Sequence, residues 1–162
     1  MNKNEGIFIP KKVATVYCNG GKEENISCDK GCNGCSECIK VCKDEAIYIN
    51  KKEIAQVDEE KCTGCGKCVY VCEKGIIRVR EKGACITPLC SNTSMGKDAI
   101  SACLHSCIAC RKCEKICPAQ ACKVINNRSR IADIMCLNCG ACISVCPRDV
   151  IKDKRGIYTK EI

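Results

Sequence analysis

Hydrophobic residues in this chain come in short runs separated by polar and charged positions. Runs of Ile, Val and Tyr bounded by polar residues predict short strands, at 46–49, 54–57, 76–79, 123–125, 130–134 and 156–159. The first two, AIYI and IAQV, lie on either side of NKKE and predict a hairpin, and KVI with RIADI predicts a second one. Helices are expected only as pieces of one to three turns.

No apolar run approaches the length of about 20 residues that crosses a membrane. The N-terminal segment MNKNEGIFIPKK is polar and lacks the apolar stretch of a secretory signal. The pattern therefore predicts no membrane span in this sequence and a cytoplasmic location, where thiols stay reduced.

The cysteine-rich segments repeat along the chain. CDKGCNGCSECIKVC (28–42) recurs as CLHSCIACRKCEKIC (103–117), and KCTGCGKCVYVC (61–72) recurs as MCLNCGACISVC (135–146). The repeat predicts two homologous modules, at 13–82 and 85–162. The segment REKGACITP joins them and has the charge and the Gly and Pro residues typical of a linker.

The composition shows what these modules need for stability. Of 162 residues, 22 are Cys, and only 52 are apolar once the cysteines are set aside. So small an apolar supply indicates that disulfides or bound metal help to hold the fold. Because no secretory signal precedes these cysteines, we expect metal ligands.

Four motifs have the spacing C-x2-C-x2-C-x3-C, which is typical of [4Fe–4S] clusters. The two-residue gaps let a tight loop wrap one side of the cluster, and small loop residues allow close approach. The fourth Cys of each motif is expected to bind the other cluster of a two-cluster pair. The predicted ligand sets are Cys32, Cys35 and Cys38 with Cys72; Cys62, Cys65 and Cys68 with Cys42; Cys107, Cys110 and Cys113 with Cys146; and Cys136, Cys139 and Cys142 with Cys117.

Structural zinc is the alternative for these thiols. Zinc sites commonly use two separated C-x2-C pairs, and eight thiols per module would suffice for two zinc ions. That alternative describes a zinc-stabilised interaction module without a redox role. Three consecutive C-x-x-C steps with a displaced fourth Cys, repeated four times, favour iron–sulfur clusters instead.

The net charge of +8 would ordinarily suggest nucleic acid as a partner. Sixteen thiolates around four cores of about +2 each contribute about −8, which brings the sum close to zero. We therefore expect no nucleic-acid partner. The basic residues around the motifs are expected to be solvated, or to dock an acidic redox partner.

Each module resembles a bacterial two-cluster ferredoxin domain. Both resemble more closely the ferredoxin region of the B subunit of the Rnf electron-transport complex. The segments VYCNGGKEENISCDKGCNGCSECIKVC and PLCSNTSMGKDAISACLHSCIACRKCEKIC, each with its partner motif, carry this resemblance. It implies an α+β fold in which short hairpins and helices surround two clusters with pseudo-twofold symmetry. It also implies transfer of single electrons between redox proteins, as a subunit or donor of a larger oxidoreductase.

Two features depart from that family. Its B subunits carry an N-terminal membrane anchor with a further cysteine-bearing segment, neither of which appears in this sequence, so a soluble polyferredoxin is expected. The Pro that follows the fourth Cys is present as Pro118 and Pro147, but Lys43 and Glu73 stand at the matching positions of the first module. No nucleophile–base pair or phosphate-binding loop is visible, so we expect an electron carrier without a substrate-level active site.

Six cysteines lie outside the four motifs. Cys85 and Cys122 have no counterpart in the other module and are expected to be buried free thiols. Cys18 with Cys28, and Cys90 with Cys103, recur in both modules. Packing thiols or a local disulfide is the favoured interpretation for these four, and the alternative is a fifth metal site across the two modules. The only His, His105, is expected to be an exposed loop residue.

Overall fold

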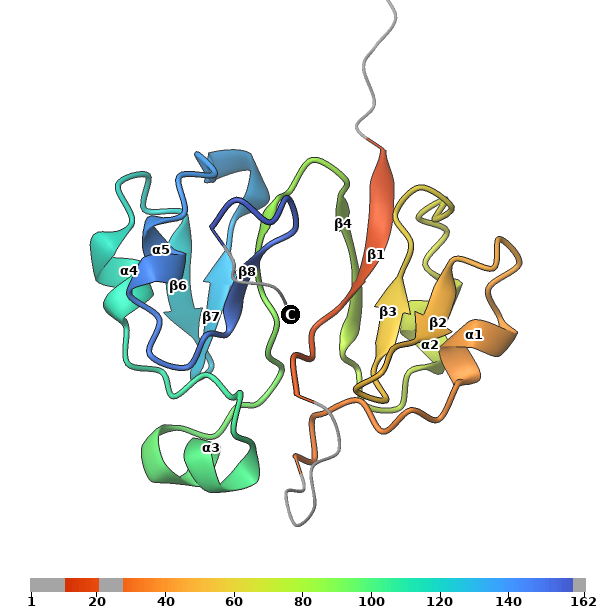
Figure 1. Cartoon of the computed structure of the whole chain (residues 1–162), viewed down its shortest axis with the longest axis horizontal. Coiled ribbons are helices and arrows are strands. Elements are labelled where there is room, and N and C mark those ends of the chain that lie inside the picture. The colour runs from red at the N-terminus through yellow and green to blue at the C-terminus, as the bar shows by residue number, and fades with distance from the viewer. Residues whose placement is uncertain (1–10, 21–27, 159–162) are drawn as a thin grey trace, which may run out of the picture.

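The computed structural model describes residues 11–20 and 28–158. Its elements are short strands and helices joined by tight turns (Figure 1). The strands are β1 (Lys12–Val16), β2 (Ile47–Ile49), β3 (Ala55–Val57), β4 (Ile77–Glu81), β5 (Ile86–Pro88), β6 (Cys122–Ile125), β7 (Arg128–Ile131) and β8 (Ile151–Asp153). The helices are α1 (Glu37–Lys40), α2 (Lys67–Val71), α3 (Gly96–Ala102), α4 (Lys112–Ile116) and α5 (Ala141–Ser144), with a 3-10 turn η1 (Asp133–Met135).

The strands form four antiparallel pairs, two in each half of the chain. In the first half β2 pairs with β3 as a hairpin, and β1 pairs with the distant β4. The second half repeats this plan, with the hairpin β6–β7 and the long-range pair β5–β8. The fold is therefore α+β and consists of two tandem modules built on the same plan, which occupy opposite sides of Figure 1.

Each half also has its own apolar core. The first is built around Val13, Ile47 and Ile76, and the second around Ile86 and Ile151. Cysteines of the motifs belong to both cores. Each half thus has its own core, and its strands pair only with strands of the same half. The module boundaries 13–82 and 85–162 stay a prediction.

The hydrophobic pattern predicted the two hairpins, and both are present. The expected strand at 156–159 is wrong over its described part, because residues 156–158 form bends with Ile157 and Tyr158 exposed to solvent; residue 159 lies outside the described residues. The strand at this end is β8, whose residues are all buried. The expected strand at 130–134 is also shorter, since β7 ends at Ile131 and η1 follows it.

Polar contacts join the two halves. The Ser91 hydroxyl donates to the Tyr17 carbonyl oxygen at 3.0 Å, and the Asn19 side-chain amide donates to the Asp149 carbonyl oxygen at 3.2 Å. The buried Arg80 guanidinium forms two hydrogen bonds to the Asp133 carboxylate, with Nη2–Oδ1 at 2.5 Å and Nε–Oδ2 at 3.2 Å. These contacts fix the halves next to each other.

Within the described residues, no helix has the length and apolar character needed to cross a membrane.

Candidate metal centres

The loops of the four motifs have the same backbone shape. In each loop, the residue before the second Cys and the residue before the helix are in the left-handed region, with φ between 53° and 77°. Left-handed residues within such loops turn successive N–H groups toward a concavity, which suits an anionic cluster. These residues are Gly34 and Ser36, Gly64 and Gly66, Ala109 and Arg111, and Asn138 and Gly140.

The helices place the thiols in a repeated order of burial. Helices α1, α2, α4 and α5 each begin one residue before the third Cys of a motif. The third Cys is buried in every motif and the second is exposed. Each motif therefore directs one thiol into the core and another toward the surface.

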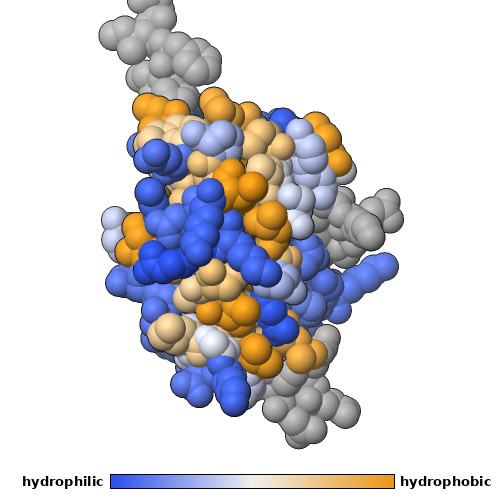
Figure 2. All heavy atoms as spheres, turned by 90° about the vertical axis from the view of Figure 1, so that its left-hand side faces the viewer, coloured by the Kyte–Doolittle hydropathy of each residue, from blue (hydrophilic) through white to orange (hydrophobic). Residues whose placement is uncertain are grey.

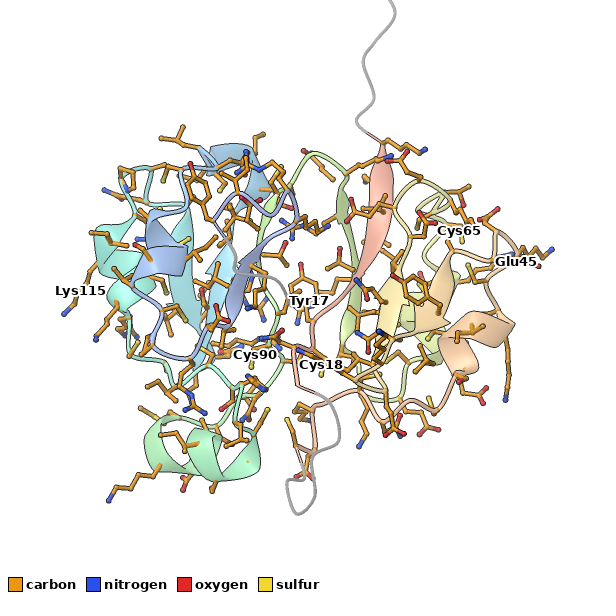
Figure 3. All side chains as sticks on the ribbon, in the orientation of Figure 1. Tyr17, Cys18, Glu45, Cys65, Cys90 and Lys115 are labelled. Atoms are coloured by element: carbon orange, nitrogen blue, oxygen red, sulfur yellow. The ribbon has the colours of Figure 1, made fainter. Side chains whose placement is uncertain are left out.

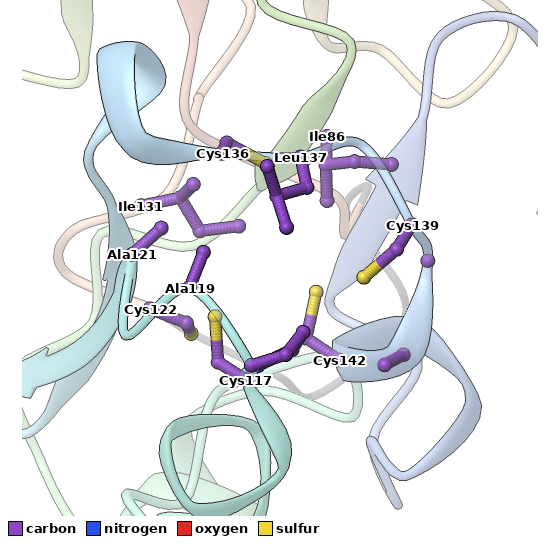
Figure 4. A pocket seen from close by; sticks show the side chains of 13 residues that line it. Ile86, Cys117, Ala119, Ala121, Cys122, Ile131, Cys136, Leu137, Cys139 and Cys142 are labelled. Atoms are coloured by element: carbon purple, nitrogen blue, oxygen red, sulfur yellow. The ribbon is translucent and has the colours of Figure 1, made fainter.

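Three cavities bring together thiols from different motifs. A cavity of about 340 Å3 is lined by Cys136, Cys139 and Cys142 together with Cys117 from the preceding motif. Figure 4 shows the sulfur atoms of Cys117, Cys139 and Cys142 directed into this space. The combination is the one that the crosswise arrangement predicts.

The other ligand sets show the same exchange between motifs. A cavity of about 450 Å3 is lined by the first motif's three leading thiols and Cys72, and one of about 350 Å3 is lined by the third motif's leading thiols and Cys146. In the second motif, Cys68 lies close enough to Cys42 for the two thiols to interact electrostatically. Three of the four predicted combinations therefore line one cavity each.

Backbone amides point at several of these sulfur atoms. The N–H of Ala14 donates to Cys62 Sγ at 3.3 Å, and the N–H of Ala46 donates to Cys42 Sγ at 3.3 Å. Ala55 donates in the same way to Cys32 Sγ at 3.4 Å. Such bonds stabilise the thiolate form and raise the potential of a cluster bound to it.

Burial acts in the opposite direction on the third thiol of three motifs. Burial, together with the neighbouring thiols, raises the pKa of Cys38 and of Cys68 to about 11 and that of Cys142 to about 12. The fourth, Cys113, differs because a hydrogen bond with Cys122 lowers its pKa below the ordinary value of a thiol. Binding a metal at the first three requires the release of their protons.

The donor set of each site fits a [4Fe–4S] cluster. Four thiols line each of the three cavities, and the loops and hydrogen bonds supply N–H groups that donate to thiolate sulfur. Among the described residues, no three His, Cys, Asp or Glu side chains are arranged to hold a single metal ion. Instead, the thiols of three sites line cavities to which two motifs contribute.

The cysteines outside the motifs differ in their surroundings. Every cysteine of the chain is unpaired, so the local disulfide considered for Cys18 with Cys28 is not formed. Cys122 is buried, as expected, whereas the expectation of a buried Cys85 is wrong, because this residue is partly exposed. The expectation of an exposed His105 is wrong, because its ring is half-buried at a cavity between the modules.

Comparison with known proteins agrees with this geometry. Residues 31–76 and residues 106–151 each match the family described as the 4Fe-4S dicluster domain. The chain is 36% identical over 141 residues to the B subunit of an ion-translocating oxidoreductase complex from Methanosarcina acetivorans, a match that covers 87% of this chain and 52% of that protein. It is 35% identical to the B subunit of a Na(+)-translocating ferredoxin:NAD(+) oxidoreductase complex from Acetobacterium woodii, with coverage of 87% and 49%.

The chain thus spans about half the length of these two relatives. Among solved structures, a formate dehydrogenase–heterodisulfide reductase–formylmethanofuran dehydrogenase complex from Methanospirillum hungatei matches 75% of this chain and 51% of its own chain. That match has 20% identity and a TM-score of 0.28. Two dicluster domains provide for four [4Fe–4S] clusters. The chain belongs to the 4Fe-4S dicluster-domain proteins, with two such domains in tandem, and resembles the ferredoxin region of oxidoreductase B subunits.

Proposed function

We propose that this protein relays single electrons through four [4Fe–4S] clusters between redox proteins. The observation that carries the proposal is the grouping of thiols from two motifs at three of the four sites, which matches the crosswise ligand pattern of two-cluster ferredoxins. The sixteen ligands in this proposal are the first three Cys of each motif, together with the fourth Cys of its partner motif. The chain's own contribution is to position, insulate and tune the clusters.

The proposed partners are redox proteins of a larger oxidoreductase complex. Support comes from the two relatives, which are named as subunits of such complexes. In this proposal the substrate chemistry takes place on other chains. A cytoplasmic location accords with 22 unpaired cysteines, because a reducing compartment keeps thiols available for iron.

The surface of the second module offers places for a partner to approach. Figure 2 shows this face, where hydrophobic areas alternate with hydrophilic ones. The exposed Cys139 and the exposed side chains of Ile134 and Leu137 lie in or beside the fourth motif. An electron can leave a cluster only over a short distance, so exposed ligand loops are suitable points of exchange.

Anaerobic loading of the full chain tests the proposal. We expect at least about sixteen iron and sixteen sulfide per chain, a brown colour that bleaches on reduction, and uptake of at least about four electrons in a reductive titration. The reduced protein should then pass these electrons to an added oxidised ferredoxin. Colourless protein, or about eight irons or fewer with zinc making up the balance, would refute the relay and favour the zinc-stabilised interaction module.

A further inference from the structure

The largest of these cavities is an open hollow between the two modules. Its walls include four cysteines that the dicluster motifs do not use: Cys18 and Cys28 from the first module, and Cys90 and Cys103 from the second. Figure 3 shows Cys18 and Cys90 where the two halves meet. All four lie outside the segments that match the dicluster family.

The two modules present these thiols in matching ways. The N–H of Cys32 donates to Cys18 Sγ at 3.4 Å, and the N–H of Cys107 donates to Cys90 Sγ at 3.4 Å. Each of these donors is the first Cys of a cluster motif. An amide aimed at sulfur is the contact that stabilises a thiolate ligand.

The other two thiols sit at the start of matching turns. Gly31 N–H donates to the Cys28 carbonyl oxygen at 2.9 Å, and Ser106 N–H donates to the Cys103 carbonyl oxygen at 3.3 Å. Each turn leads directly into the first Cys of a motif. The arrangement is therefore a site with two thiols from each repeat.

The thiols approach one another across the module boundary. A Cβ atom added to Gly20, two residues from Cys18, would lie only 3.1 Å from Cys103 Sγ. Burial is the main cause that raises the pKa of Cys18, Cys28 and Cys90, and a thiol of the other module adds to the rise in each case. The thiol that adds to the rise is Cys103 for both Cys18 and Cys28, and it is Cys28 for Cys90.

Basic groups surround the same space. Lys30, Lys74 and His105 line the cavity, with Asp29 as the acidic group on its wall. Arg128 lies near enough to Cys90 to interact with its charge. A [4Fe–4S] core of about +2 held by four thiolates carries a net charge of about −2, which the charges of Lys30, Lys74 and Arg128 would offset.

We propose that Cys18, Cys28, Cys90 and Cys103 hold a fifth [4Fe–4S] cluster at the boundary of the two modules. Packing alone accounts poorly for them, because side chains in a core fill space and these four line a hollow that is larger than each of the three motif cavities. The repeat explains why such a site exists, since each module contributes the same half.

The position of this cluster deepens the proposed relay, on which its role rests. Its ligands Cys18 and Cys90 are each one hydrogen bond from a motif, the first at Cys32 and the second at Cys107. An electron from the reduced cluster of one module would reduce the fifth cluster, and the cluster of the other module would then reoxidise it. Each step moves one electron and requires no proton or ligand exchange.

Iron and sulfide analysis with native mass spectrometry tests the site in the full chain. Anaerobically loaded wild-type protein should hold about twenty iron and twenty sulfide. The double variant Cys28→Ser/Cys103→Ser, which removes one ligand from each module, should hold about sixteen. Cys85→Ser is the matched control, because this thiol contacts the Gly83 carbonyl oxygen and lies outside the cavity lining; it should retain about twenty.

The single variant Cys90→Ala adds a spectroscopic readout. A site left with three thiolates should lose one iron and show a three-iron EPR signal in the oxidised protein, while the four motif clusters keep their signals. About sixteen irons in wild-type protein, with or without one zinc, would overturn the fifth cluster and leave the four-cluster relay intact. About eight irons or fewer would overturn the relay itself.

Discussion

Gly64 lies in the loop of the second cysteine motif, in close contact with strand β1. Its φ angle is 70°, and a Cβ atom at this position would lie 2.5 Å from the Lys12 carbonyl oxygen and 2.8 Å from the Lys12 carbonyl carbon. Both neighbours are backbone atoms of a paired strand, so they cannot move as a side chain can. We predict that Gly64→Ala destabilises the site built by this loop.

Two energies contribute to the effect. An Ala in the left-handed region costs about 1 kcal/mol relative to Gly. The position equivalent to Gly64 in the third motif is Ala109, with φ of 57°. The fold therefore tolerates the cost of the left-handed conformation when no collision accompanies it. Overpacking against a fixed backbone adds about 1–3 kcal/mol.

Gly75→Ala separates these two energies. Gly75 has a φ of 60°, but no described atom lies within 4 Å of its added Cβ. Its counterparts after the other motifs are Glu45, Gln120 and Asp149, all with φ near 50°. This variant therefore carries the left-handed penalty without the collision.

The assay follows iron–sulfur absorbance after addition of a chelator to anaerobic protein, because loss of clusters is irreversible and must be measured as a rate. Strain in the loaded state speeds the opening of the loop. The extra 1–3 kcal/mol or so predicts that Gly64→Ala releases the affected cluster about 5- to 150-fold faster than Gly75→Ala. Equal rates for the two variants would show that β1 yields to the added methyl group, and the reasoning would fail.

Three further changes have expected outcomes. Cys72→Ala should convert the cluster of the first motif into a three-iron species by EPR and spare the cluster of its own motif; the reverse pattern would contradict crosswise ligation. Arg80→Met should destabilise the module boundary by about 2–3 kcal/mol, seen as a lower thermal midpoint of loaded protein. The substitution leaves the Asp133 carboxylate, whose side chain is 22% exposed, without its buried guanidinium partner. An unchanged thermal midpoint would show that the Arg80–Asp133 ion pair does not stabilise the boundary. Removal of iron by chelator should abolish cooperative folding, and native-like NMR dispersion of the apo chain would refute this.

Much of the motif architecture could be predicted from the sequence because it depends on local spacing. Three thiols at two-residue intervals allow few loop conformations that bring all three to one cluster. The structure has such a loop, followed by a helix that begins next to the third Cys, four times. The pairing of β1 with β4 escaped prediction, since its register joins residues more than 60 positions apart, such as Val16 with Ile77. The error at 156–159 came from a short apolar run that carries no information on burial.

The four cysteines of the intermodule cavity show a different limit. Their spacing within one module, Cys18 with Cys28 or Cys90 with Cys103, gives only half a site, so the sequence favoured packing or a local disulfide. Only the fold brings both halves to one cavity. The internal repeat was the available signal, because a pair of extra thiols retained in both copies can form one site of four.

The arginines beside this cavity add an electrostatic reason for an anionic group there. Arg78, Arg80, Arg128 and Arg130 line a second intermodule cavity of about 430 Å3, which also includes Cys90. Burial lowers the pKa of Arg78 and Arg128, and the charge of neighbouring guanidinium groups lowers both further. Like charges gathered in a partly buried space repel one another. A cluster of net charge about −2 next to Cys90 would offset that repulsion, because it attracts the guanidinium groups. The packing of one module on the other should therefore itself depend on the fifth cluster.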